Sequence, residues 1–244
     1  MKTLVIIPTY NETQSIKEVI LGLLGLTADL EILVVDDNSP DGTAQTVKSI
    51  GSPRIHLLAR ETKAGLGAAY RAGFQWAALS PNFTHYVTMD GDGSHRYQDL
   101  PAMLERAKNA DVVMGSRWMP GGSIENWPKY RQWISRVGTS YARRALKLPL
   151  SDLTGGFRVY STQLLKRLRL QAVSSDGYCF QIEMVRAAHS AGATFAESPI
   201  SFVEREQGES KMSRKIVAEA LIRVSIWGLQ TRFVINADKL HYVK

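Results

Sequence analysis

The sequence has one cysteine in 244 residues and no long apolar run. A single thiol, Cys179, excludes an internal disulfide. Because no metal-ligand spacing surrounds it, we expect a core thiol in a reducing compartment. No run approaches the roughly 20 apolar residues that cross a bilayer. The apolar run near the N-terminus is interrupted by Pro8, Asn11 and Glu12, which is not typical of a signal peptide. We therefore expect a cytoplasmic protein, soluble or peripheral on the cytoplasmic face of a membrane.

Several familiar binding motifs are missing too. The Gly-Leu-Gly segment at 65–67 has neither P-loop spacing nor the dinucleotide fingerprint. The five histidines have no zinc spacing. The formal charge of +7, from 30 Lys and Arg against 23 Asp and Glu, indicates an anionic partner or simply a basic surface. Because no basic–aromatic module accompanies this charge, we expect no nucleic acid partner.

Buried strands and amphipathic helices alternate through the first half of the chain. Continuous apolar runs predict strands at 3–8, 31–36, 55–58, from 85 to the following Asp pair, and at 111–115. Helical spacing predicts helices at 15–26, 65–79, 99–108, 130–148, 181–191 and 216–228, with further strands at 155–160 and 193–203. The alternation favours an α/β fold with a mostly parallel sheet flanked by helices. We expect a single domain over 1–235, including an amphipathic helix at 214–232, and a tail at 236–244.

Polar segments follow the predicted strand ends. In open α/β sheets, ligands bind beyond the carboxyl ends of the strands. The segments 8–12, 36–37, 90–94 and 116–117 all occupy such places. We therefore expect them to meet along one edge of the sheet.

Asp90 and Asp92 follow the fourth predicted strand, in a turn with Gly91 and Gly93. Two carboxylates two residues apart can lean to the same side of an extended backbone. A hard divalent cation binds one or two carboxylates and completes its shell with substrate phosphates and water. This pattern indicates a metal–diphosphate clamp, although a bare Asp-x-Asp is also typical of an ordinary turn. His95 is expected to support the pair rather than bind the metal.

Other candidate residues complete a nucleotide-sugar site. Glu12 and Asp37, beyond the first two strands, suit the nucleoside. Guanidinium and ammonium groups stabilise the charge that develops on a diphosphate leaving group. Candidates for this role are Arg117, Arg131, Arg205 and Lys211, each of which is alternatively a solvated surface charge.

The motifs as a set resemble a known family. The segments 7–12 (Ile-Pro-Thr-Tyr-Asn-Glu), 34–43, 65–69 and 89–95 (Met-Asp-Gly-Asp-Gly-Ser-His) resemble family 2 glycosyltransferases with the GT-A, Rossmann-like fold. The segments 152–158, 177–182 and 202–212 are similar to the polyprenol-phosphate (dolichol-phosphate) mannose synthases, above all those of actinobacteria. The resemblance covers roughly residues 3 to 233.

The resemblance implies an inverting transfer of mannose from GDP-mannose to a polyprenyl phosphate, with Mg²⁺ or Mn²⁺. The donor nucleotide would lie against Pro8, Tyr10, Glu12, Val35 and Asp37. Metal and diphosphate would be held at Asp90, Gly91 and Asp92, with Ser94 as a further metal-facing position. The catalytic set would be Asp90, Asp92, Arg117, Arg131, Arg205 and Lys211, whose cations bind the donor diphosphate and the acceptor phosphate. Two positions depart from the family: Gly91 replaces a usual Ala, which we expect to be harmless, and Ser94 replaces the Gln of some members.

A phosphate acceptor would also explain the lack of an obvious general base. Its second pKa is about 6, so it is largely dianionic at pH 7 and already nucleophilic. For another acceptor, Asp41 or Asp152 remains available as a base.

The segments 130–148 and 214–232 mix basic and aromatic residues. Such helices can lie on anionic bilayers. We expect one of them to form an apolar groove next to the arginines, at an anionic membrane surface or beside a membrane-anchoring partner protein. The alternative is that both simply pack on the sheet.

Two other functions stay open. The chain could use another nucleotide sugar, such as UDP-glucose, or it could bind nucleotide sugar or lipid phosphate without catalysis.

Overall fold

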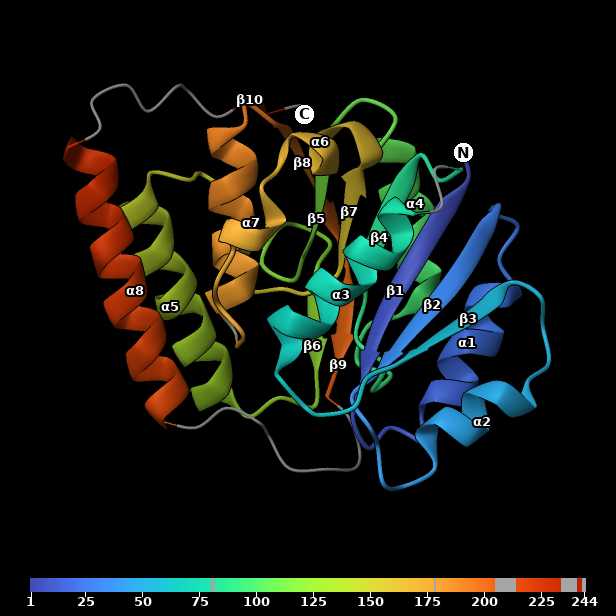
Figure 1. The fold of residues 1–244 in the computed structure, drawn as a ribbon. Helices are drawn as coiled ribbons and strands as arrows, with labels where there is room; N and C mark the ends of the chain where they lie inside the picture. Colours follow the sequence, from blue (N-terminus) through green and yellow to red (C-terminus); the bar gives the residue numbers. More distant parts are fainter. Residues whose placement is uncertain (80–81, 178, 205–213, 234–240, 243–244) are drawn as a thin grey trace.

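The computed structural model describes residues 1–79, 82–177, 179–204, 214–233 and 241–242, with only the backbone for 214–219, 231–233 and 241–242. An eight-stranded sheet has the order β10-β8-β5-β7-β4-β1-β2-β3 (Figure 1). Its strands are β1 (Thr3–Thr9), β2 (Leu30–Asp36), β3 (Ile55–Ala59), β4 (His85–Thr88), β5 (Val112–Ser116), β7 (Arg158–Ser161), β8 (Thr194–Pro199) and β10 (His241–Tyr242). Within this sheet only β7 runs antiparallel to its neighbours. The mostly parallel α/β fold is therefore confirmed.

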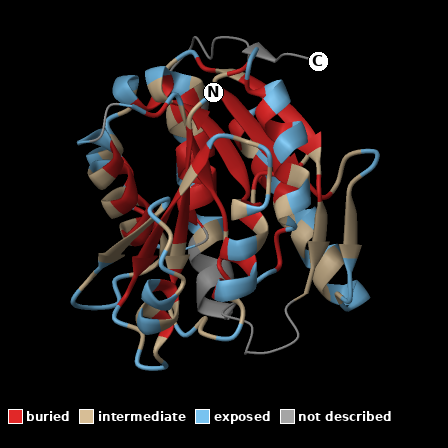
Figure 2. Cartoon of the chain, turned by 90° about the vertical axis from the view of Figure 1, so that its right-hand side faces the viewer, coloured by how far each residue is buried: buried red, intermediate tan, exposed pale blue. Residues whose placement is uncertain are grey.

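The central strands are buried on both faces, which explains their continuous apolar runs. Leu4 and Ile6 of β1 belong to one core cluster, and Val5 and Ile7 belong to the other. The first cluster includes residues of α3 (Leu66–Ala78), α5 (Lys129–Leu146), α6 (Thr162–Arg167), α7 (Cys179–Ser190) and α8 (Arg214–Phe233). The second includes residues of α1 (Ile16–Leu24), α2 (Thr43–Ser49) and α4 (Leu100–Arg106). Figure 2 shows the resulting layers, with buried strands between helices whose outer faces are exposed.

Helices α5 and α8 stand side by side at one end of the molecule (Figure 1). Tyr141 Oη and Ser225 Oγ share a hydrogen bond of 2.6 Å between them. A Cβ on Gly228 would lie 3.0 Å from the carbonyl oxygen of Ala145, so the two backbones approach closely there. The pair forms a wall beyond the sheet.

Two strand predictions differ from the structure. The run at 193–203 divides into β8 and β9 (Ser201–Val203), and β9 pairs with β6 (Ser123–Glu125) in a separate two-stranded sheet. Pro199 ends the main-sheet strand, because proline has no amide hydrogen for a ladder. The run at 155–160 forms a strand only from Arg158, and the preceding glycines stay in a turn. Of the segment expected to be a tail, His241 and Tyr242 pair in parallel with β8.

Candidate active site

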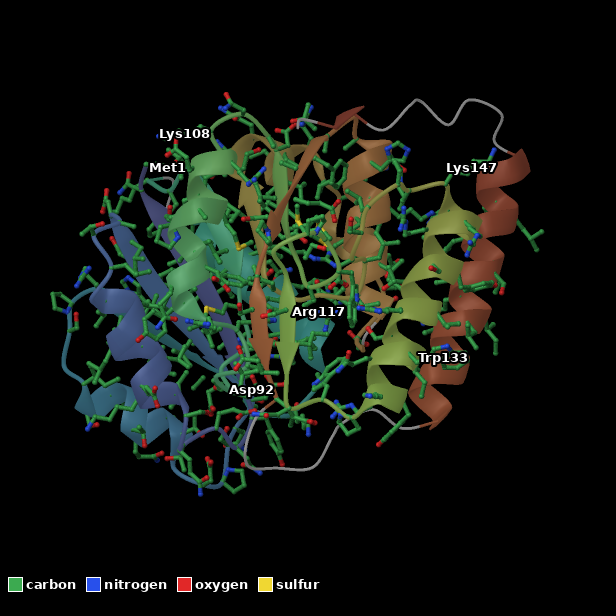
Figure 3. All side chains as sticks on the ribbon, turned by 180° about the vertical axis from the view of Figure 1, so that it is seen from behind. Met1, Asp92, Lys108, Arg117, Trp133 and Lys147 are labelled. Carbon is green, nitrogen blue, oxygen red and sulfur yellow. The ribbon has the colours of Figure 1, made fainter. Side chains whose placement is uncertain are left out.

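A cavity of about 590 Å³ opens at the carboxyl ends of the parallel strands. Figure 3 shows Asp92 at this end, while Met1 and Lys108, which precede β1 and β5, lie at the opposite end. Polar residues of the first four strand ends line one part of the cavity: Pro8, Thr9, Tyr10, Glu12, Asp37, Lys63, Asp90, Gly91, Asp92, Ser94 and His95. The predicted meeting of strand ends is confirmed.

The Asp pair lies in the cavity wall, and its turn fixes the Asp92 carboxylate. The Asp90 side chain is 34% exposed. Asp92 Oδ1 accepts hydrogen bonds from the Ser94 backbone N–H at 3.0 Å and from the Ser94 hydroxyl at 2.6 Å. These two bonds hold the Asp92 carboxylate in one orientation. Ser94, which we expected to face the metal, therefore also orients Asp92.

The His95 ring packs beneath the Asp90–Ser94 turn and is hydrogen-bonded to its backbone. Its side chain is buried, stacked on Phe157 with ring centroids 5.3 Å apart, and set edge-on to Phe202. The Asp90 backbone N–H donates to His95 Nδ1 at 3.1 Å. The same nitrogen lies 3.8 Å from Asp90 Oδ2, so the ring also stands beside the Asp90 carboxylate. The geometry agrees with the supporting role expected for His95.

The residues present fit a hard divalent cation whose coordination shell is completed by a bound ligand and water. Across the described ranges, no group of three or more His, Cys, Asp or Glu side chains is arranged around a metal position. Two carboxylates with a hydroxyl beside them form an all-oxygen set that suits Mg²⁺ or Mn²⁺. Such a site leaves the remaining positions to phosphate oxygens and water.

One end of the cavity is built on Asp37. Arg60 Nη1 donates to Asp37 Oδ1 at 2.7 Å, and the backbone N–H of Ala64 donates to Oδ2 at 3.3 Å. Burial raises the pKa of Asp37 above its usual value, although Arg60 opposes the change. Nearby, the Lys63 ammonium lies 3.7 Å from the centroid of the Tyr10 ring. Neither Lys63 nor Arg60 was among the site residues expected from sequence.

One expected pocket residue lies elsewhere. Val35 is fully buried in the core on the α3 side of the sheet and does not line the cavity. A Cβ on Gly73 of α3 would lie 3.3 Å from Val35 Cγ2. Successive strand residues face opposite sides, so Val35 is directed into the helix layer rather than toward the strand end.

Arg117 reaches the cavity as half of a buried ion pair. Its Nε lies 2.7 Å from Asp152 Oδ2 and its Nη2 lies 2.9 Å from Asp152 Oδ1. Nη2 also donates to the Thr154 hydroxyl at 2.8 Å. The guanidinium is flanked by the rings of Trp127 and Phe202, at 5.5 and 5.3 Å from their centroids.

Arg131 contacts the Trp127 ring as well. It forms an ion pair with Glu204 and stands 4.7 Å from the Trp127 centroid. Both arginines thus line the cavity, as expected. Arg205 and Lys211 lie outside the described residues.

Neither proposed general base is placed to act as one. Burial raises the pKa of Asp152, but Arg117 outweighs it and holds that pKa below its usual value. Asp41 accepts hydrogen bonds from Thr43 and from the Thr13 backbone, and these bring its pKa below the usual value despite burial. Asp41 also does not line the cavity. The alternative in which either carboxylate is the base is therefore not supported.

The far end of the cavity is apolar. Its walls there come from Ile134, Gly138, Tyr141 and Ala142 of α5 and Ala220, Leu221 and Val224 of α8. The groove expected beside the arginines is therefore present, and both helices contribute to it. No helix among the described residues is long and apolar enough to cross a membrane.

Gly91 is packed more tightly than expected. A Cβ at this position would lie 3.1 Å from Ile7 Cγ2 and 3.1 Å from Thr9 Cγ2. These distances require the neighbours to move by a few tenths of an ångström. An alanine at this position is therefore not strictly neutral in this chain.

Sequence reasoning missed several cavity residues. Trp127 and Phe202, whose rings lie against Arg117, were not among the expected site residues. Gly155 and Gly156 form part of the lining, where the lack of a side chain keeps space open. Their selection depends on contacts between β4, β7 and α7, which no local pattern encodes.

Comparison with known proteins agrees with this geometry. The family model "Glycosyl transferase family 2" matches residues 4–169. The chain is 46% identical over 235 residues to an undecaprenyl-phosphate mannosyltransferase of Micrococcus luteus, covering 96% of each chain. It is 42% identical to a polyprenol monophosphomannose synthase of Mycolicibacterium smegmatis, covering 95% of this chain and 88% of that one.

A solved structure gives the fold independently. Glucosyl-3-phosphoglycerate synthase from Mycobacterium tuberculosis, in complex with Mn²⁺, UDP and glucosyl-3-phosphoglycerate, aligns with a TM-score of 0.65 at 16% identity. The alignment covers 96% of this chain and 81% of that one. The strand-end cavity and these matches identify the class: the chain belongs to glycosyl transferase family 2. Its similarity to polyprenol-phosphate mannose synthases is confirmed.

Proposed function

We propose that this chain transfers mannose from GDP-mannose to a polyprenyl phosphate, with inversion at the anomeric carbon. One observation carries the proposal. A single cavity joins the end at Asp37, the Asp90–Asp92 pair, two arginines and an apolar groove. These parts match the four parts of the reaction: nucleoside, diphosphate, acceptor phosphate and lipid chain.

At the donor, Asp90 and Asp92 would hold Mg²⁺ or Mn²⁺ together with the diphosphate. The bound cation would neutralise the leaving group's charge. Ser94 keeps Asp92 in place for this task through the two bonds described above. Pro8, Tyr10, Glu12 and Asp37 would line the nucleoside, and Lys63 joins this set.

At the acceptor, a phosphate oxygen would attack the anomeric carbon of mannose while the bond between that carbon and the diphosphate breaks. A new C–O bond forms, GDP leaves with the electron pair, and no proton has to be removed. This agrees with the lack of a placed base at Asp41 or Asp152. Arg117 and Arg131 would hold the phosphate, and we retain Arg205 and Lys211 as further ligands of the two anionic groups.

The lipid chain would lie in the groove between α5 and α8. Exposed apolar side chains continue outward from this groove: Tyr130, Trp133, Ile134, Val137, Leu221, Ile222, Ile226 and Leu229. Arg136, Arg143 and Arg144 are exposed on the same α5 helix. We propose that this surface rests on an anionic membrane, from which the acceptor enters.

The test is a transfer assay with GDP-mannose and a short polyprenyl phosphate. Metal-dependent transfer that EDTA stops, and that Asp92→Ala lowers by at least about 10²-fold, is expected. UDP-glucose is run in parallel under the same conditions. Transfer from UDP-glucose alone would reject the donor, and metal-dependent binding of GDP-mannose without turnover would reject the catalytic role.

A further inference from the structure

A small space on the cavity floor lies beside the Asp90 carboxylate. Gly156 lines the cavity, and a Cβ on it would lie 3.4 Å from Asp90 Oδ1, 3.4 Å from Gln181 Nε2 and 3.5 Å from His95 Cε1. Because glycine has no Cβ, these three side chains face one common space. We call it the Gly156 niche.

Among the described residues, neither end of the Gln181 amide has a hydrogen-bond partner. The Gln181 side chain is 2% exposed. Buried polar side chains are nearly always paired, because an unpaired one destabilises the fold. Gln181 itself does not line the cavity, but its amide lies against the cavity-lining Gly156, so we look for its partner in a bound ligand.

The position of Gln181 is nevertheless fixed. Arg158 Nη1 donates to the backbone carbonyl oxygen of Gln181 at 2.6 Å, and Arg158 itself is fully buried. The preceding residue, Phe180, stacks on Tyr70 with ring centroids 5.6 Å apart. The Tyr70 hydroxyl is a second buried polar group without a partner in the described structure. The backbone is thus held rigidly while the amide is left unused.

The chemistry of the niche selects its ligand. The amide offers donors and an acceptor, and the Asp90 carboxylate offers only acceptors. A hydroxyl group satisfies both, because it can donate to the carboxylate and accept from the amide. The His95 edge facing the niche is a carbon atom and does not compete. In the donor held by Asp90 and Asp92, hydroxyl groups lie on both sides of the diphosphate, on the ribose and on the hexose. GDP keeps the ribose and lacks the hexose, so comparing the two ligands tells which hydroxyl enters the niche.

We propose that Gln181, together with Asp90, binds a hydroxyl of the transferred hexose in the Gly156 niche. This inference rests on the proposed function and names one contact that would recognise the sugar. It assigns Gln181 to binding and specificity, and leaves nucleotide and metal binding to the residues already described.

The experiment compares two ligands on one protein. The dissociation constants of GDP-mannose and of GDP are measured by calorimetry with Mn²⁺, for the wild-type chain and for Gln181→Met, which keeps a similar volume. We expect GDP-mannose to bind about five- to tenfold more weakly to the variant, as for one lost hydrogen bond, and GDP to bind equally. Gln163→Met, at an exposed position of α6, is the matched control.

A second variant fills the niche without removing the amide. In Gly156→Ala the new Cβ meets its neighbours at ordinary contact distances of 3.4–3.5 Å, so the fold is retained. The same selective loss of GDP-mannose affinity is expected. Gly25→Ala is the control, because its Cβ contacts are also ordinary, at 3.5 Å, and it lies outside the cavity lining.

The outcomes separate this inference from the proposed function. If wild-type protein transfers mannose while both variants keep its GDP-mannose to GDP affinity ratio, the inference is wrong and the function stands. An equal loss for both ligands would also overturn it, because it would indicate a structural role. If the wild-type chain does not bind GDP-mannose, both proposals fall together.

Discussion

Arg117 and Asp152 form a bidentate ion pair in the wall of the cavity, with N–O distances of 2.7 and 2.9 Å. The Asp152 side chain is fully buried. Strand β5 ends at Ser116, so Arg117 is the first residue beyond it. Asp152 lies in the turn before β7, the antiparallel neighbour of β5. The pair therefore fixes the Arg117 guanidinium to the loop that carries Thr154 and Gly155.

Breaking this pair should destabilise the protein strongly. Asp152→Asn leaves the Arg117 charge buried without its counter-ion, and we expect a loss of about 3–5 kcal/mol in the free energy of unfolding. Urea denaturation measures the change. Glu105→Gln breaks the exposed Glu105–Lys108 pair instead and should cost less than about 1 kcal/mol. A loss as small as the control's for Asp152→Asn would mean that the pair contributes little.

The same carboxylate should make stability depend on pH in the acid range. Burial raises the pKa of Asp152, but Arg117 lowers it further, so the folded value lies below the unfolded value of about 3.9. Its contribution is therefore complete above that unfolded pKa and is lost as the pH falls through the folded one. The midpoint of urea denaturation should fall more between pH 5 and pH 3 for the wild-type chain than for Asp152→Asn. Parallel pH profiles for the two proteins would contradict this.

Removing the Ser94 hydroxyl should weaken metal use while leaving the two carboxylates present. Without the hydroxyl, Asp92 Oδ1 loses the 2.6 Å hydrogen bond and retains the bond from the backbone N–H of residue 94. Loss of such an orienting bond typically weakens a metal site by about 10- to 100-fold. We expect Ser94→Ala to raise the Mn²⁺ concentration for half-maximal transfer within that range. An unchanged metal requirement would show that Ser94 does not position Asp92.

Gly91→Ala should cost stability, and Gly138→Ala should not. The Gly91 Cβ would press on Ile7 and Thr9 at 3.1 Å, and overpacking of this kind costs about 1–3 kcal/mol. Gly138 lies inside helix α5 with no atom within 4 Å of its Cβ, so alanine there should stabilise by about 0.5–1 kcal/mol. Thermal unfolding of the two variants gives the comparison. Equal melting temperatures would mean that the Asp turn is more adaptable than its contacts indicate.

The outer surface of α5 and α8 should mediate vesicle binding. Trp133 and Ile222 are 67% and 61% exposed and do not line the cavity. Replacing both with serine should reduce binding to anionic phospholipid vesicles by at least about tenfold, because their apolar area would no longer enter the membrane. Transfer to a short, water-soluble acceptor should be preserved. Leu79→Ser, at a position 85% exposed but on neither helix, is the control, and equal vesicle binding by all three proteins would reject the membrane surface.

The sheet was predictable because its signal is local. Apolar runs such as Leu4 to Ile7 are buried on both faces and need no distant partner to be recognised. The placement of Asp90, Asp92 and Asp37 followed from the rule that parallel strands end at one edge. Val35, which the resemblance placed at the nucleotide, faces the helix layer instead, because its side-chain direction depends on the pleat of the strand.

The sequence by itself determined the α/β fold, the strand-end location of the site, the Asp pair and the family. Strand burial, turn chemistry and motif spacing are properties of short segments, so one chain is enough to recognise them. Only the tertiary structure decided that Arg117 pairs with Asp152 and that α5 and α8 form one groove. It also left the Gln181 amide unpaired beside Gly156. Each of these facts joins residues far apart along the chain, and their contacts exist only once the sheet and helices have packed together.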